Sequence, residues 1–106
     1  MTGLSTHVLD TARGEPAAGI AVRLERDGQE VARGVTDADG RIADFGTGQL
    51  PAGAYRLVFD TGPYLGGDQD AFFPEIVICF QADGRRPKYH LPLLLSPYSY
   101  ATYRGS

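Results

Sequence analysis

One stretch decides the fold class: Ile20-Ala21-Val22-Arg23-Leu24-Glu25-Arg26, followed by Asp27-Gly28. Apolar and polar side chains alternate along it with a period of two, which is the pattern of a β-strand with one buried face. Asp-Gly is a common two-residue hairpin turn. The chain is therefore expected to reverse at residues 27–28 and to continue as a second strand.

The same alternation recurs along most of the chain. Fourteen Gly and seven Pro separate short alternating stretches, which is typical of an all-β protein. The predicted strands cover residues 4–10, 20–26, 30–36, 41–43, 55–60, 75–81, 88–95 and 98–104. Eight short strands in 106 residues predict a single domain, residues 1–106, that consists of two packed antiparallel sheets.

Composition excludes several classes of partner. Ten basic and thirteen acidic residues give a net charge of −3, and no basic run is present, so nucleic acid and anionic membranes are disfavoured as partners. No charged leader and no long apolar segment indicates export or membrane insertion, so a cytoplasmic location is predicted. The single Cys79 lies in an apolar run and is expected to be a small buried side chain.

Alternation also predicts where the two histidines point. In the first strand His7 shares a side with Ser5 and Leu9, opposite the residues of the better core face. In the strand over 88–95, His90 points away from Tyr89 and the leucines that follow it at alternate positions. Both histidines are therefore expected on the outer face of the sandwich.

The last strand should extend this outer face. We expect Tyr98 and Tyr100 to pack inward, which leaves Ser99, Ala101 and Tyr103 on the side of the histidines. The outer face would then carry several apolar side chains, namely Leu9, Pro92, Leu94 and Ala101. Such a surface indicates a protein partner, and a second copy of the chain is the simplest one.

Two motifs at opposite ends of the chain carry a family resemblance. Near the start stand Leu4-Ser5-Thr6-His7-Val8-Leu9-Asp10-Thr11 and Gly14-Glu15-Pro16-Ala17, and the chain ends in Tyr103-Arg104-Gly105-Ser106. Together they resemble the transthyretin-like family and, within it, the 5-hydroxyisourate hydrolases. The resemblance implies a sandwich of two four-stranded sheets with one short helix in residues 61–73. It also implies a homotetramer with active sites in a channel at the dimer–dimer interface.

The activity that the resemblance implies is hydrolysis of 5-hydroxyisourate to 2-oxo-4-hydroxy-4-carboxy-5-ureidoimidazoline in urate breakdown, without a cofactor. It implies catalytic roles for His7, Arg41 and His90, where transthyretins carry Lys, an acidic residue and Thr. A histidine can take a proton from water and return it, and an arginine presents a fork of donors to ureide oxygens. Sequence leaves open which histidine is the base.

The C-terminal tetrapeptide is implied to bind substrate through Tyr103, Arg104, Gly105 and Ser106. On a regular strand Tyr103 and Arg104 face opposite ways. Both reach one site only if the strand ends or twists near Gly105, which glycine makes plausible.

Other interpretations stay open at this stage. Each histidine could be an ordinary surface residue, and Arg41 an ordinary turn residue. Two histidines could bind zinc with a third ligand, but the sequence places no such ligand, so no metal is predicted. The chain could also be a transthyretin-type carrier of a small aromatic ligand or a structural β-sandwich module, although neither function needs the two histidines and Arg41.

Overall fold

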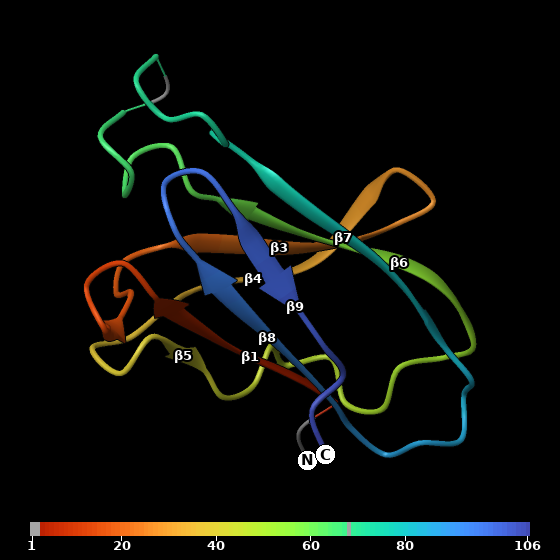
Figure 1. The fold of residues 1–106 in the computed structure, drawn as a ribbon. Coiled ribbons are helices and arrows are strands. Elements are labelled where there is room, and N and C mark those ends of the chain that lie inside the picture. The colour runs from red at the N-terminus through yellow and green to blue at the C-terminus, as the bar shows by residue number, and fades with distance from the viewer. Residues whose placement is uncertain (1–2, 68) are drawn as a thin grey trace.

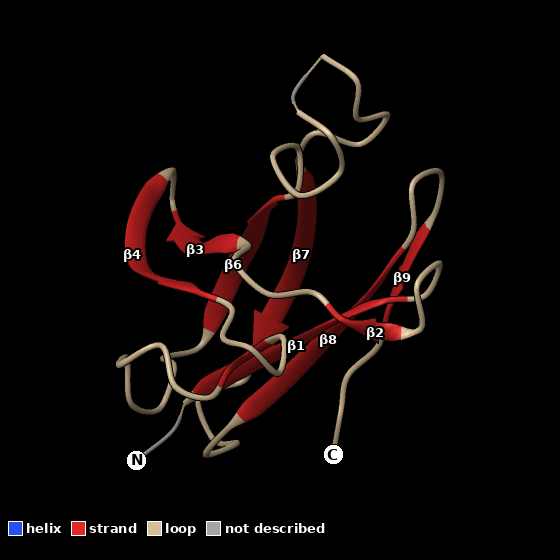
Figure 2. Ribbon diagram, turned by 90° about the vertical axis from the view of Figure 1, so that its left-hand side faces the viewer, coloured by secondary structure: helices blue, strands red, loops and turns tan. Residues whose placement is uncertain are grey.

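The computed structural model describes residues 3–67 and 69–106, which form two β-sheets packed face to face (Figure 1, Figure 2). Within these residues the strands are β1 (Leu4–Asp10), β2 (Glu15–Pro16), β3 (Ala21–Arg26), β4 (Gln29–Val35), β5 (Arg41–Ile42), β6 (Gly53–Asp60), β7 (Ile76–Ala82), β8 (Tyr89–Leu95) and β9 (Tyr100–Thr102). One sheet has the order β2-β1-β8-β9, with β5 also paired to β1, and the other has the order β4-β3-β6-β7. The predicted all-β sandwich is confirmed.

The first sheet differs from the prediction in two ways. It has five strands, because the short strands β2 and β5 both pair with β1. In addition, β1 and β8 run parallel, from the pair Leu4–Tyr89 to the pair Asp10–Leu95, so this sheet is not purely antiparallel. Figure 1 shows β1 beside β8, with β9 on the far side of β8, although β1 comes from the opposite end of the chain. Parallel neighbours need a long crossover connection, and here the second sheet lies between them in sequence.

The short helix expected within residues 61–73 is not found in the described part of that segment, residues 61–67 and 69–73, which form turns. Leu65 N–H donates to the Thr61 carbonyl at 3.0 Å, which closes one helical turn. Gly66 and Gly67 then adopt φ values of 107°, outside the right-handed helical region, so the turn does not continue. The described residues contain no helix long and apolar enough to cross a membrane.

The core lies between the sheets and follows from strand alternation. Along β1, Leu4, Thr6, Val8 and Asp10 are buried, and the residues between them are half-buried. Side chains from both sheets, among them Leu24, Leu57, Phe59, Leu93 and Leu95, are fully enclosed. Full burial of such a side chain stabilises a fold by about 1.5–3 kcal/mol.

Two predictions about burial are wrong. Cys79 is exposed on the outer side of β7. Its neighbour Ile78 is buried and faces the other sheet, so alternation along the strand turns Cys79 away from the core. Tyr98 is 79% exposed, since it lies in the turn between β8 and β9 rather than over the core. Tyr100 pairs with the inward-facing Leu95, as the alternation predicts, yet it is 43% exposed and packs edge-on against Phe73.

A buried hydroxyl joins the loop before β3 to the end of β4. Thr36 is 4% exposed, its Oγ1 donates to the Ala17 carbonyl at 2.8 Å, and it accepts from the Ile20 N–H at 2.9 Å. The strand β3 begins at Ala21, directly after Ile20, so this contact positions the start of β3 against the core.

Thr36→Val should destabilise the fold by about 2–6 kcal/mol, because it leaves a buried N–H and a buried C=O without partners, each at about 1–3 kcal/mol. Thr36→Ser keeps the hydroxyl and should cost only about 1 kcal/mol for the lost methyl group. Urea denaturation at one fixed protein concentration measures both. Equal losses for the two variants would contradict the role of the hydroxyl.

Candidate functional site

The pairing of β1 with β8 brings the histidines to one outer face. Ser5 lies opposite His90, and His7 lies opposite Pro92. His7 and His90 are both half-buried, between neighbours whose side chains enter the core. The structure therefore places both histidines on the side of the sheet that alternation predicts.

Arg41 reaches the same face through a tight turn. The carboxylate of Asp37 accepts from the backbone N–H groups of Asp39 and Arg41, at 2.9 and 3.0 Å. Gly40 has a positive φ of 73°, and its carbonyl accepts from Val8 N–H at 2.7 Å. This bond fixes β5 against β1, with Arg41 directly opposite His7.

The C-terminal tail continues alongside β8 after β9 has ended. Gly105 N–H donates to the His90 carbonyl at 2.7 Å, in an isolated bridge. A Cβ atom on Gly105 would lie 2.7 Å from His90 Cδ2, so only glycine allows the tail to pass this close to the ring. The tail thereby brings Ser106 to the site.

The bridge decides how Tyr103 and Arg104 are directed. Thr102 pairs with Leu93 and Gly105 with His90, so the register continues unchanged across the two residues between them. Tyr103 accordingly falls on the side of His90, and Arg104 falls on the opposite side. The tail does not twist enough to bring both to one place, and Arg104 instead lines a separate cavity with Asp83, Arg86 and Tyr89.

The converging groups line an open cavity of about 320 Å³. It is lined by Ser5, Thr6, Arg41, Ala43, Lys88, His90 and Ser106. Arg41 and Lys88 are its charged side chains, so the cavity is positive and suits a ligand rich in carbonyl oxygens or negative charge. His7 and Tyr103 lie on the same face without lining the cavity.

His90 is the titratable group that this environment changes. Burial lowers the pKa of His90 below its usual 6.5, and the neighbouring basic residues, first Arg41 and then His7 and Lys88, lower it further. The ring is therefore neutral at pH 7 and has a lone pair available to accept a proton.

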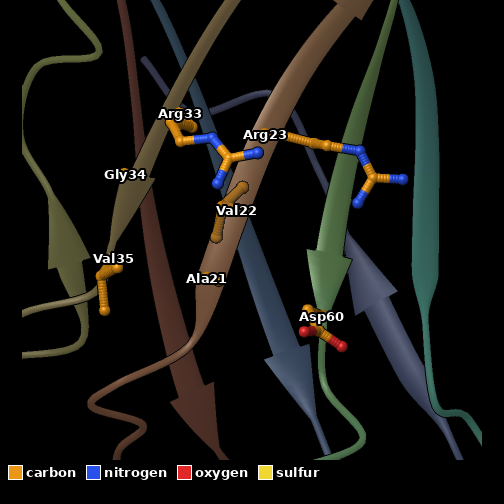
Figure 3. A pocket seen from close by; sticks show the side chains of 7 residues that line it. All are labelled: Ala21, Val22, Arg23, Arg33, Gly34, Val35 and Asp60. Atoms are coloured by element: carbon orange, nitrogen blue, oxygen red, sulfur yellow. The ribbon is translucent and has the colours of Figure 1, made fainter. Parts of the chain in front are cut away.

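A hollow of about 250 Å³ on the other sheet offers no comparable chemistry (Figure 3). Figure 3 shows the Arg33 side chain extending from β4 toward β3 and the Arg23 side chain extending from β3 across β6. Each already binds a carboxylate, Arg23 that of Glu25 and Arg33 that of Glu30. This hollow therefore has no unpaired cation for a ligand.

Sequence reasoning missed four residues of the site cavity, namely Ser5, Thr6, Ala43 and Lys88. Ser5 could have been found, because it shares the outer side of its strand with His7. Lys88 could have been found as well, because it lies two residues before His90 in the predicted strand over 88–95 and therefore on the same side. In the described residues no group of three or more His, Cys, Asp or Glu side chains is placed to hold a metal ion.

Comparison with known proteins agrees with this arrangement. A family model described as "HIUase/Transthyretin family" matches residues 4–105. The chain belongs to this family. It is 44% identical to a 5-hydroxyisourate hydrolase of Caulobacter vibrioides, with 100% of both chains covered.

Solved structures of the family show the same fold. The 5-hydroxyisourate hydrolase of Klebsiella pneumoniae has a TM-score of 0.89 at 42% identity, with 100% of both chains covered. A transthyretin from Sparus aurata has a TM-score of 0.86 at 36% identity, with 99% of this chain and 97% of that chain covered. Since both proteins superpose closely, the fold alone does not separate hydrolase from transthyretin.

Arg41→Gln should raise the pKa of His90, because it removes a neighbouring positive charge that disfavours the imidazolium. An NMR titration of the His90 ring protons measures this pKa without any assay of activity. Arg104→Gln is the matched control and should leave the pKa of His90 unchanged, because Arg104 lines the other cavity. An equal rise in both variants, or no rise in Arg41→Gln, would contradict this account of the site.

Proposed function

We propose that this chain is a hydrolase that opens the ring of 5-hydroxyisourate. The observation that carries the proposal is the cavity in which a neutral histidine, His90, lies beside Arg41, Lys88 and the tail residue Ser106. Family membership and the 44% identity to a 5-hydroxyisourate hydrolase support this substrate. The product would be 2-oxo-4-hydroxy-4-carboxy-5-ureidoimidazoline, as the sequence resemblance implies.

The chemistry of the substrate matches these side chains. Hydrolysis adds water to a carbonyl carbon of an acyl-urea, breaks the C–N bond and gives a proton to the leaving nitrogen. One of His7 and His90 takes the proton from water, a contribution of about 10²–10⁴-fold, and the other orients water or substrate. Arg41 binds the ring oxygens and the developing oxyanion, where one such donor is worth roughly 3–4 kcal/mol.

Some residues of the C-terminal tail lie at the proposed site and one does not. Ser106 lines the cavity, Gly105 packs against the His90 ring, and Tyr103 lies on the same face. Arg104 lines the cavity on the other side of the sheet, so we do not assign it to binding substrate.

We also propose that the outer face of the β1–β8 sheet is an interface between copies of the chain. Leu9 and Leu94 are only half-buried there, and Ala101 is exposed, which leaves apolar surface around the histidines. A homotetramer with the sites at its dimer–dimer interface would cover this surface. The cytoplasmic location stays a prediction from the sequence.

A transthyretin-type carrier of a small aromatic ligand is the alternative function. The similarity to the Sparus aurata transthyretin favours it. The charged cavity with His90 and Arg41 disfavours it, because an apolar aromatic ligand gains little from such groups.

The test is to generate 5-hydroxyisourate with urate oxidase and to follow the decay of its absorbance. The protein should speed the decay well beyond the spontaneous rate, and His7→Ala and His90→Ala should each slow the catalysed reaction by about 10²–10⁴-fold. Cys79→Ser, an exposed position on the other sheet, is the control and should keep full activity. A decay that stays at the spontaneous rate would overturn the proposed function, and full activity in both histidine variants would overturn the site.

A further inference from the structure

The side chain of Ser5 contacts the ring of His90. The two residues are directly opposite in the β1–β8 register, and Ser5 Oγ lies 2.8 Å from His90 Nδ1. Both side chains are half-buried, so water has only partial access to the two atoms of this contact.

The opposite edge of the His90 ring is closed by the tail. A Cβ on Gly105 would lie 2.7 Å from Cδ2, and 3.2 Å from both Cβ and Cγ of His90, so the tail backbone packs against that edge. With Nδ1 directed to Ser5 and Cδ2 directed to Gly105, the remaining edge carries Cε1 and Nε2. Because His90 lines the cavity, this remaining edge is the one available to a ligand.

The contact with Ser5 bears on which ring nitrogen of neutral His90 carries the proton. A neutral imidazole has one N–H donor and one acceptor nitrogen. The Ser5 hydroxyl can accept from a protonated Nδ1 or donate to an unprotonated one. Nε2 lies on the edge that faces the cavity, so a base at that atom requires the ring proton on Nδ1, where the Ser5 hydroxyl accepts it.

We propose that Ser5 is a positioning residue that holds His90 as the Nδ1–H tautomer, so that Nε2 is the atom that accepts the proton of the attacking water. This inference rests on the proposed function and decides which histidine is the base. His7 lies opposite Pro92 on β8 and opposite Arg41 on β5. Proline has no hydrogen-bonding side chain and a guanidinium can only donate, so neither neighbour can accept a proton from the His7 ring as Ser5 can from His90. His7 is left to orient water or substrate.

The proton balance of the step follows from this geometry. As the water oxygen bonds to the substrate carbonyl carbon, its O–H bond breaks and the proton passes to Nε2. The resulting imidazolium keeps its Nδ1–H bond to Ser5, which stabilises the added charge. When the C–N bond breaks, the same proton passes from Nε2 to the leaving nitrogen and the ring returns to its first state.

The first test is an ¹⁵N NMR measurement of the His90 ring, made at a pH where the ring is neutral. We expect Nδ1 to be the protonated nitrogen and Nε2 the unprotonated one, and Ser5→Ala to reduce this preference. A wild-type ring that carries its proton on Nε2 would overturn the proposal. The measurement needs no turnover, so it stands apart from the proposed function, which fails if 5-hydroxyisourate is not hydrolysed.

The second test is kinetic. Ser5→Ala should lower kcat about tenfold, which is the value of one ordinary hydrogen bond, with KM nearly unchanged. Ser5→Thr keeps a hydroxyl and should restore most of kcat and the Nδ1–H tautomer. Ser99→Ala removes a hydroxyl that bonds to Ser96 in the β8–β9 turn, and it should leave kcat unchanged.

Other kinetic results would overturn the positioning role. A rise in KM with unchanged kcat would mean that Ser5 binds substrate directly, since Ser5 also lines the cavity. A threonine variant as slow as the alanine variant would mean that the hydroxyl is not the active feature.

Discussion

The parallel pairing of β1 with β8 is the constraint on which both the core and the site depend. Its seven residue pairs run from Leu4–Tyr89 to Asp10–Leu95 without a break. Strand alternation then divides the two strands into a buried side and an outer side. A shift of this register by one residue would move the core residues of one strand to the outer face and would separate Ser5 from His90.

Two shorter contacts extend this pairing into a site. The bond from Val8 N–H to the Gly40 carbonyl fixes β5 on the free edge of β1, and it brings Arg41 beside His7. The bridge between Gly105 and His90 fixes the tail beside β8. The site therefore combines three parts of the chain that are distant in sequence, and each depends on the same central pair of strands.

Alternation within single strands could be predicted from the sequence, because it is a local property. It correctly placed His7 and His90 on the outer side, and it showed that Tyr103 and Arg104 conflict on a regular strand. Pairing between strands could not be predicted in the same way, since Ser5 and His90 are 85 residues apart and the packing of the whole domain sets their register. The same limit applies to Cys79 and Tyr98, because a sequence pattern does not tell which face of an edge strand or which turn lies over the core.

The shared fold gives the site its frame, and the residues on that frame give it its chemistry. A transthyretin of the same family has nearly the same fold, with a TM-score of 0.86. We propose that the difference for function lies in His7, Arg41 and His90, at positions where the sequence resemblance implies other residues in transthyretins.

The most direct test of this account is a crystal structure with an unreactive purine analogue bound. The analogue should occupy the cavity on the β1–β8 face, with its oxygens at Arg41 and one ring edge at His90 Nε2. An analogue bound instead in the cavity lined by Arg104 and Arg86, away from both histidines, would contradict it.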